Sequence, residues 1–151
     1  MISIRLPDDS TRELPIGSTG LDLALAIGKR LAQAAVATTI DGVEADLGVA
    51  LRDGVKVSII TADSVPGRHV LRHSTAHVLA QAVVQLFEGA KFSIGPAIED
   101  GFYYDFDFGD VEFSEKDLKK VEKSMKKIIT QNQEFKKFEV DFSQARKILD
   151  T

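Results

Sequence analysis

The sequence of 151 residues contains no cysteine and no tryptophan, only four prolines and only three histidines. The lack of cysteine excludes disulfide bonds, thiolate metal sites and a thiol nucleophile, and it permits a reducing compartment. The first residues, MISIRLPDDS, show no basic segment followed by an apolar one. No apolar run approaches the roughly 20 residues that span a bilayer. We therefore expect a soluble, cytoplasmic protein without membrane contact.

The composition is that of a folded protein, with 44% hydrophobic and 28% charged residues. The length allows one ordinary domain or two small ones. A net charge of −4 argues against nucleic-acid binding by the whole surface, but the charge is uneven. Residues 114–137 hold eight lysines and four acids, whereas every charged residue of 99–112 is acidic. The sequence thus allows a positive patch beside a negative one.

The first sixty residues predict short strands around one helix. Alternating apolar residues indicate two strands joined by a turn at 7–10, the second strand running to Leu14 and Ile16, and further short segments at 36–40, 43–47 and 55–60. Thr19 and Asp22 have the spacing of a helix capping box, and Gly28 suits the helix end. The expected buried face consists of Leu21, Ala24 and Leu25. This order predicts an α+β protein that begins with a β-grasp, ubiquitin-like domain at residues 1–62.

Residues 63–67 are expected to form a linker, after which the predicted elements are longer. A helix is predicted over 68–88, strands over 91–98 and 101–108, and a second long helix from Ser114, with Asp117 as its capping partner. In the second strand the aromatic residues alternate with polar ones, which predicts that the aromatic side chains face inward. A short strand at 138–142 and a final helical turn capped by Ser143 complete residues 68–151.

All three histidines lie on the first long helix at a spacing of four, which stacks them along one face. The predicted core stripe of this helix lies on another face (Leu71, Thr75, Val78, Leu79, Ala82, Leu86). Small and apolar neighbours around the histidines predict neutral, partly desolvated imidazoles that are able to bind metal, orient water or move protons. The alternative is a set of helix-edge histidines bonded to backbone or water. A zinc protease is disfavoured because a third ligand is missing and Ser74-Thr75 replaces the required glutamate.

The segment RHSTAHVLAQAVVQLF, followed by KFSIGPAIEDGFYYDFDF, resembles the start of the editing domain of bacterial-type threonyl-tRNA synthetases. The preceding sixty residues resemble the TGS domain with which those enzymes begin. The resemblance covers essentially the whole chain in the family's own order. It implies an enzyme that uses ATP to join threonine to tRNA(Thr) and that hydrolyses seryl-tRNA(Thr) formed by mistake. TGS domains also occur in GTPases, and this one has no phosphate-binding loop.

The resemblance assigns roles to residues that match the family's motif. His73, His77 and Tyr104 match its editing site, where we expect them to orient the attacking water and the terminal ribose. Gly95 and Pro96 match the adjacent substrate-binding turn, whereas His69 has no counterpart. No metal site is expected in this chain.

The family completes its editing site with a later lysine and a CxxxH segment, which are absent here. We therefore expect an N-terminal fragment in which residues 68–151 form an incomplete α+β editing domain, inactive by itself. ATP with magnesium, and zinc, are implied only for the absent synthetase domain. The resemblance further implies a parent that dimerises through absent domains and a monomeric fragment.

The lysines of the second long helix lie largely outside its predicted buried stripe (Leu118, Val121, Met125, Ile128, Ile129). They form either a solvated face with pairs such as Glu122–Lys126 or a set of phosphate contacts to the acceptor end of tRNA(Thr). The candidates for tRNA contact are Lys119, Lys120, Lys123, Lys126 and Lys127. Two competing hypotheses remain: a non-catalytic RNA-binding or spacer module with packing histidines, and a stand-alone metal hydrolase, which the missing third ligand disfavours.

Overall fold

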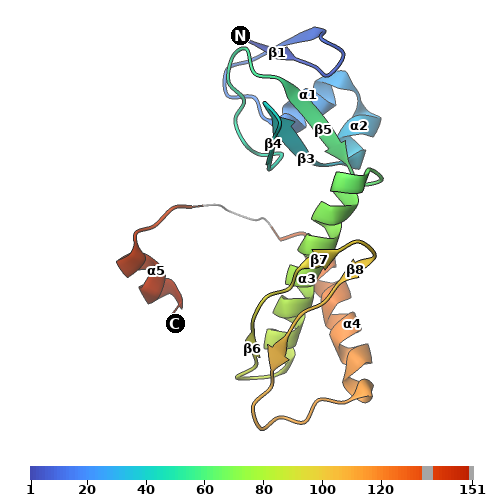
Figure 1. Ribbon diagram of the computed structural model, residues 1–151, viewed down its shortest axis with the longest axis vertical. Coiled ribbons are helices and arrows are strands. Elements are labelled where there is room, and N and C mark those ends of the chain that lie inside the picture. Colours follow the sequence, from blue (N-terminus) through green and yellow to red (C-terminus); the bar gives the residue numbers. More distant parts are fainter. Residues whose placement is uncertain (134–137, 150–151) are drawn as a thin grey trace.

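The computed structural model describes residues 1–133 and 138–149, and it shows two halves joined by one long helix (Figure 1). The first half is built of five strands and two short helices. In chain order they are β1 (Ile2–Arg5), β2 (Thr11–Leu14), α1 (Gly20–Ile27), α2 (Lys29–Ala34), β3 (Ala35–Ile40), β4 (Val43–Ala45) and β5 (Val57–Thr61).

The strands of the first half combine into a mixed arrangement. β1 pairs antiparallel with β2, and β3 pairs antiparallel with both β4 and β5. A parallel bridge between Arg5 and Lys56, with the Arg5 N–H donating to the Val55 carbonyl at 3.0 Å, joins β1 to the start of β5. The strand order is therefore β2-β1-β5-β3-β4. The first and last strands of this half in the sequence, β1 and β5, lie side by side in the middle. This order and the mixture of helices and strands confirm the predicted α+β class and the β-grasp fold.

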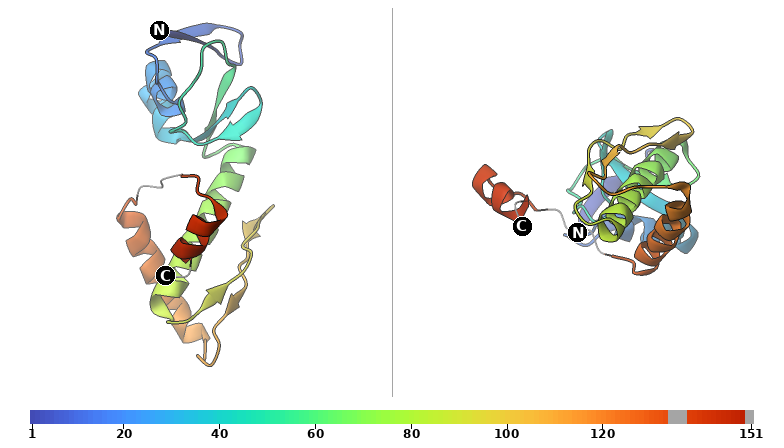
Figure 2. Two further views of the ribbon diagram at one scale, coloured as in Figure 1. Left: turned by 90° about the vertical axis from the view of Figure 1, so that its left-hand side faces the viewer. Right: turned by 90° about the horizontal axis from the view of Figure 1, so that it is seen from below.

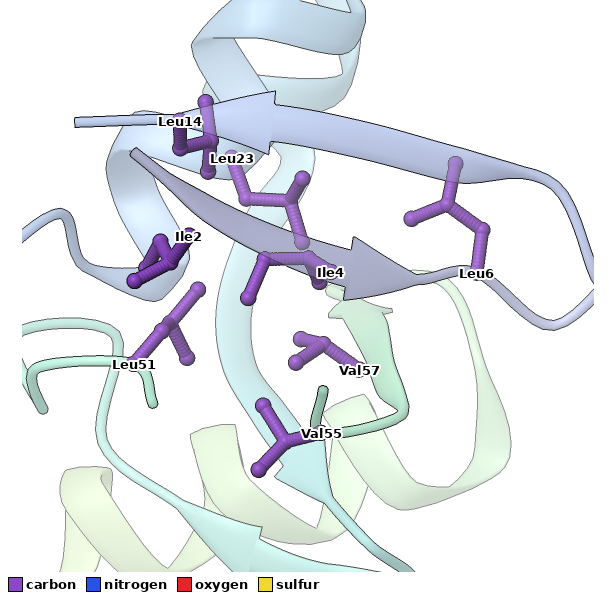
Figure 3. Packing of buried hydrophobic residues seen from close by; sticks show 8 residues of the cluster. All are labelled: Ile2, Ile4, Leu6, Leu14, Leu23, Leu51, Val55 and Val57. Carbon is purple, nitrogen blue, oxygen red and sulfur yellow. The ribbon is translucent and has the colours of Figure 1, made fainter. Parts of the chain in front are cut away.

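A single apolar cluster fills the space between these strands and α1 (Figure 3). Ile2 and Ile4 point inward from β1 at the two-residue period of a strand. The whole cluster consists of Ile2, Ile4, Leu6, Leu14, Leu23, Leu51, Val55 and Val57. This core contacts only one face of α1, so only the residues on that face of the helix are buried.

The predicted capping box of α1 is present, since Asp22 and Thr19 exchange hydrogen bonds between side chain and backbone. The predicted buried face is wrong at Leu21 and Leu25, which are 42% and 52% exposed. Gly20 is buried against Thr38 of β3, and this contact turns residues 20, 23 and 24 inward instead. The helix α2 was not predicted, and the second strand ends at Leu14 rather than Ile16.

Within residues 63–133 and 138–149, the second half consists of three helices and two short strand pairs. Its elements are α3 (Val65–Leu86), β6 (Lys91–Phe92), β7 (Ala97–Ile98), β8 (Gly101–Phe102), β9 (Phe106–Asp107), α4 (Glu115–Thr130) and α5 (Phe142–Leu149). β6 pairs with β9 and β7 with β8. The predicted long strands are thus interrupted between the two pairs, where Pro96 lacks the N–H that a ladder requires.

The helix α3 begins at Val65, three residues earlier than predicted, so that the end of the expected linker 63–67 is helical. Ser64 caps it by accepting a hydrogen bond from the Gly67 N–H at 3.1 Å, and Pro66 occupies the first turn, where its missing N–H costs nothing. Gly67 lies directly on the Thr61 carbonyl at the end of β5. The first half therefore passes into α3 with no flexible spacer.

The helices α3 and α4 pack against each other through small and branched side chains. Leu71 and Leu86, predicted in the core stripe, are exposed, whereas Ala76 and Ala80 are buried. The cluster that joins α3 to α4 is formed by Ala82, Val83, Val121 and Ile128. Small residues allow α4 to approach closely and so decide which face of α3 is buried. On α4 the predicted stripe is wrong at Leu118 and Ile129, which are exposed.

The helix α5 stands apart from the other elements (Figures 1 and 2). The predicted strand at 138–142 is wrong: residues 138–141 form no strand, and Phe142 begins α5. Asp141, not Ser143, caps this helix, because its Oδ1 accepts from the Gln144 N–H at 2.9 Å. Within the described residues, no helix combines the length and apolar character that crossing a bilayer requires.

Candidate functional site

The three histidines lie on α3 as their spacing predicted, and all three are exposed. The prediction of partly desolvated rings is therefore wrong for the described chain. Ala76 and Ala80, which the helical spacing places beside the rings, are buried, so the histidines lie at the edge between the buried and the exposed sides of α3.

His73 and His77 form a direct pair, with their Nε2 atoms 3.1 Å apart and ring centroids 4.7 Å apart at 81°. For this contact to be a hydrogen bond, one ring donates its Nε2–H and the other accepts at Nε2, so the two rings differ in protonation at these atoms. A water or hydroxyl that replaces this mutual bond meets a donor and an acceptor one helical turn apart. Such a pair is suited to orient a water molecule and to accept its proton.

Gly95 and Tyr104, which come from the two sides of the interrupted strand pair, lie in direct contact. A Cβ atom on Gly95 would stand 2.1 Å from Cδ2 and Cε2 of the Tyr104 ring, so only glycine permits this approach. The ring also stacks on Phe106 at 5.1 Å and 22° and meets Phe92 edge-on at 6.0 Å. Pro96 is half-buried beside it. The structure thus fixes Tyr104 in an aromatic row that continues through Phe108.

The two groups of predicted site residues line different cavities. His77 lines a groove of about 750 Å³ between α3, the end of α4 and the β3–β4 region of the first half. Polar side chains in this groove include Asp46, Ser74, Gln81 and Gln133. Tyr104 lines a separate apolar cavity with Leu79, Phe106 and Phe113, among others. Neither cavity is lined by both His77 and Tyr104.

The groove beside His77 contains residues that sequence reasoning missed. Gln81 donates to Gln133 at 3.0 Å and so ties α3 to the chain that follows α4. Gln81 continues the spacing of four set by the histidines, and this is the signal that could have found it. Asp46 comes from the first half, and no local pattern marks it.

The helix α4 presents its lysines as predicted, but two of them are engaged with acids. Lys120 bonds to Asp117 at 2.8 Å, and Lys126 bonds to Glu122 at 2.5 Å, which confirms the predicted Glu122–Lys126 pair. The Lys120 bond, together with bonds from Ser114, lowers the pKa of the Asp117 carboxyl below its ordinary value of 3.8. Lys119, Lys123 and Lys127 are exposed on the same helix. Of the five lysines predicted to contact tRNA, these three are in none of the ion pairs found among the described residues.

Residues 1–133 and 138–149 contain no cluster of three or more histidine or carboxylate side chains that could hold a metal ion. The His73–His77 pair by itself supplies two nitrogen ligands. A catalytic zinc commonly uses three protein ligands. The pair alone therefore supplies one ligand fewer than such a zinc site uses.

Comparison with known proteins identifies both halves of the chain. Residues 2–61 match the model of the TGS domain. Over 144 residues, or 95% of the chain, it is 49% identical to a threonine–tRNA ligase of Pelobacter propionicus, and it covers 22% of that protein. It is 51% identical over 84% of its length to one from Citrifermentans bemidjiense, and 43% identical over 97% to one from Oceanobacillus iheyensis.

The chain spans about a fifth of the length of these relatives, 20% to 23%. The matched region includes the TGS domain and continues through α3, the interrupted strand pair and α4. The chain therefore belongs to the threonine–tRNA ligase family, whose N-terminal region it matches and whose TGS domain it carries at residues 2–61.

Proposed function

We propose that this chain serves as the N-terminal part of an enzyme that charges tRNA(Thr) with threonine and clears seryl-tRNA(Thr) by hydrolysis. In this proposal residues 1–62 form the TGS domain, 63–67 the junction, and 68–151 the first part of the editing domain. Serine lacks only a methyl group of threonine, and such a difference yields about 1–3 kcal/mol of discrimination at one binding site. A second, hydrolytic site supplies the remainder.

The observation that carries the proposal is the His73–His77 pair, whose nitrogens lie 3.1 Å apart on an open helix face. We assign the pair to orienting and deprotonating the water that attacks the seryl ester. Tyr104, held against Gly95, and the adjacent Pro96 are assigned to the substrate-binding turn. Because the described residues do not enclose the rings, the proposal requires further residues of the longer enzyme to cover them. ATP, magnesium and zinc are assigned to the parts of such enzymes beyond this region.

The test uses a full-length threonine–tRNA ligase that carries this N-terminal region. His73→Ala and His77→Ala should each slow the deacylation of seryl-tRNA(Thr) by about 10²-fold or more, the usual contribution of a positioned acid or base. The rate of threonine charging is the internal control. His69→Ala, on the same helix but outside the pair, should leave deacylation unchanged. Unchanged deacylation in both pair variants would refute the assignment.

A second candidate function is RNA binding without hydrolysis by the chain alone, and the exposed lysines of α4 favour it. The acceptor end of tRNA(Thr) is the proposed ligand, with Lys119, Lys123 and Lys127 as phosphate contacts. For single-stranded or duplex RNA the logarithm of the binding constant falls with the logarithm of the salt concentration, by a little less than one per phosphate contact. Replacing one of these lysines with alanine should reduce that slope, whereas Lys29→Ala, on α2 of the first half, should not.

The longer enzyme is proposed to dimerise through domains outside this region, and the present chain to be monomeric in the cytoplasm. Sedimentation of the purified chain at several concentrations measures the oligomeric state. A concentration-dependent dimer would contradict this part of the proposal.

A further inference from the structure

A polar pocket of about 400 Å³ lies between α3 and the turn that joins β7 to β8. The helix contributes Val65, Arg68, His69 and Arg72, and the turn contributes residues 97–100. Positive side chains thus face Glu99 and Asp100 across the pocket. Neither His69 nor the two arginines has a role in the proposed chemistry.

Arg72 differs from the other basic residues of this pocket. It is half-buried, whereas Arg68 and His69 are exposed. Its Nη1 donates to the Ile98 carbonyl at 3.5 Å, a long hydrogen bond whose strength depends on the charge of the donor. Arg68 instead donates to the carbonyl of Asp63, which lies just before the start of α3. Arg72 is therefore the guanidinium that connects α3 with the β7–β8 turn.

Both β7 and β8 lie against α3. Two residues before β7 is Gly95, and two residues after β8 is Tyr104. Arg72 immediately precedes His73 on the helix. The bond from Arg72 to Ile98 thus joins the segment that holds the histidine pair to the segment that holds Tyr104.

We propose that Arg72 is a positioning residue that fastens the β7–β8 turn to α3 and so sets the separation between the histidine pair and Tyr104. The catalytic meaning of that separation rests on the proposed editing function, whereas the fastening itself does not. Glu99 and Asp100 add attraction across the pocket, which salt weakens because these side chains are exposed. Removal of Arg72 leaves the turn with its short ladder of two residue pairs, its apolar contacts and the weaker attraction of Glu99 and Asp100 to Arg68.

The absence of cysteine allows a direct measurement on the whole 151-residue chain. Gln85→Cys on α3 and Tyr103→Cys after β8 place two spin labels at exposed positions on the two segments. The distribution of distances between the labels should be narrow in the parent chain. Arg72→Met keeps the apolar stem but removes the donor, and it should broaden the distribution and shift it to longer distances.

Arg68→Met is the matched control, because it makes the same change of charge in the same pocket without touching the bond to Ile98. It should leave the distribution narrow. Arg72→Lys, which retains a charged donor, should restore most of the parent distribution. If the methionine variant loses helix content by circular dichroism, Arg72→Leu, which also lacks a donor, replaces it. No broadening without the guanidinium, or equal broadening in Arg68→Met, would overturn the proposal.

A second readout separates this inference from the proposed function. In a full-length relative, Arg72→Met should lower kcat for seryl-tRNA(Thr) deacylation by about tenfold with little change in KM, as misplacement of reacting groups does. One outcome is that the distances broaden in Arg72→Met, while neither Arg72→Met nor His73→Ala changes the rate of deacylation. This outcome would contradict the proposed function and support the fastening role. Unchanged distances would overturn the fastening role whatever the deacylation rate.

Discussion

Replacing Gly95 with alanine should displace the Tyr104 ring. The added Cβ would lie 2.1 Å from two ring carbons, and ordinary contact begins at 3.4 Å. One of the two groups must therefore retreat by more than about 1 Å. The ring is the softer partner, since a side chain swings about its own bonds whereas the Gly95 backbone is held by its chain neighbours.

The loss in the free energy of unfolding caused by Gly95→Ala follows from the contacts that the Tyr104 ring loses. Tyr104 stacks on Phe106 and meets Phe92 edge-on, and each such aromatic contact contributes about 0.5–1.5 kcal/mol. Alanine recovers about 0.4–1 kcal/mol by restricting the unfolded chain. We expect a net loss of about 1–2 kcal/mol in the free energy of unfolding of the second half, together with a ring that no longer occupies one position.

The assay uses the near-ultraviolet circular dichroism of tyrosine, which is clean because the chain has no tryptophan and only two tyrosines. Tyr103 is 56% exposed and contributes little, so the signal reports mainly on Tyr104. Gly95→Ala should remove most of this signal and lower the midpoint of urea unfolding. Gly101→Ala is the matched control, because a Cβ there meets nothing within 4 Å. Equal spectra for Gly95→Ala and the parent chain would refute the reasoning.

Three further predictions concern stability. Gly67→Ala would place a Cβ 1.9 Å from the Thr61 carbonyl oxygen, so it should destabilise the chain by about 1–3 kcal/mol in urea unfolding although alanine favours helix; a stabilised variant would contradict this contact. Thr38→Val should raise the free energy of unfolding by about 1 kcal/mol, because the Thr38 hydroxyl is buried without a partner; a loss of stability would show that the hydroxyl is bonded. The lowered pKa of Asp117, caused first by its bond from Lys120, predicts stability that is complete above the ordinary value of 3.8 and lost as the pH falls through the lowered one. Acid titration followed by helix circular dichroism should therefore be shallower in Asp117→Asn, and an unchanged titration would count against the bond.

Short sequence patterns correctly predicted the features that depend only on residues close together in the sequence. The capping boxes at Thr19 and Ser114 depend on residues three apart, and the structure contains both. The faces that the helices bury depend on partners distant in sequence. The contact of Gly20 with Thr38 determines which face of α1 is buried. For that reason the prediction that Leu21 belongs to the core is wrong. The predicted strand at 138–142 failed similarly, because the alternation of apolar residues gives no ladder without a neighbouring strand.

The candidate site divides in the same way. The spacing of four placed His73 against His77, and the structure shows their rings in contact. The same reasoning could not supply the bond from Arg72 to Ile98 or the groove shared by His77 and Asp46, since both join segments more than 25 residues apart. The sequence pattern also could not predict the exposure of the histidine rings, because this exposure depends on which other segments cover that face of α3.

The unbroken course of α3 has a mechanical consequence. With 22 residues the helix is about 33 Å long, and His73 lies roughly 12 Å from its start. Its first turn is clamped to the end of β5 by the Ser64 hydroxyl, which donates to the Thr61 carbonyl at 2.7 Å. A tilt of the TGS domain by about ten degrees would therefore swing the imidazoles by about 2 Å and the far end by about 6 Å. The helix can thus transmit a tilt of the TGS domain to the histidines as a displacement.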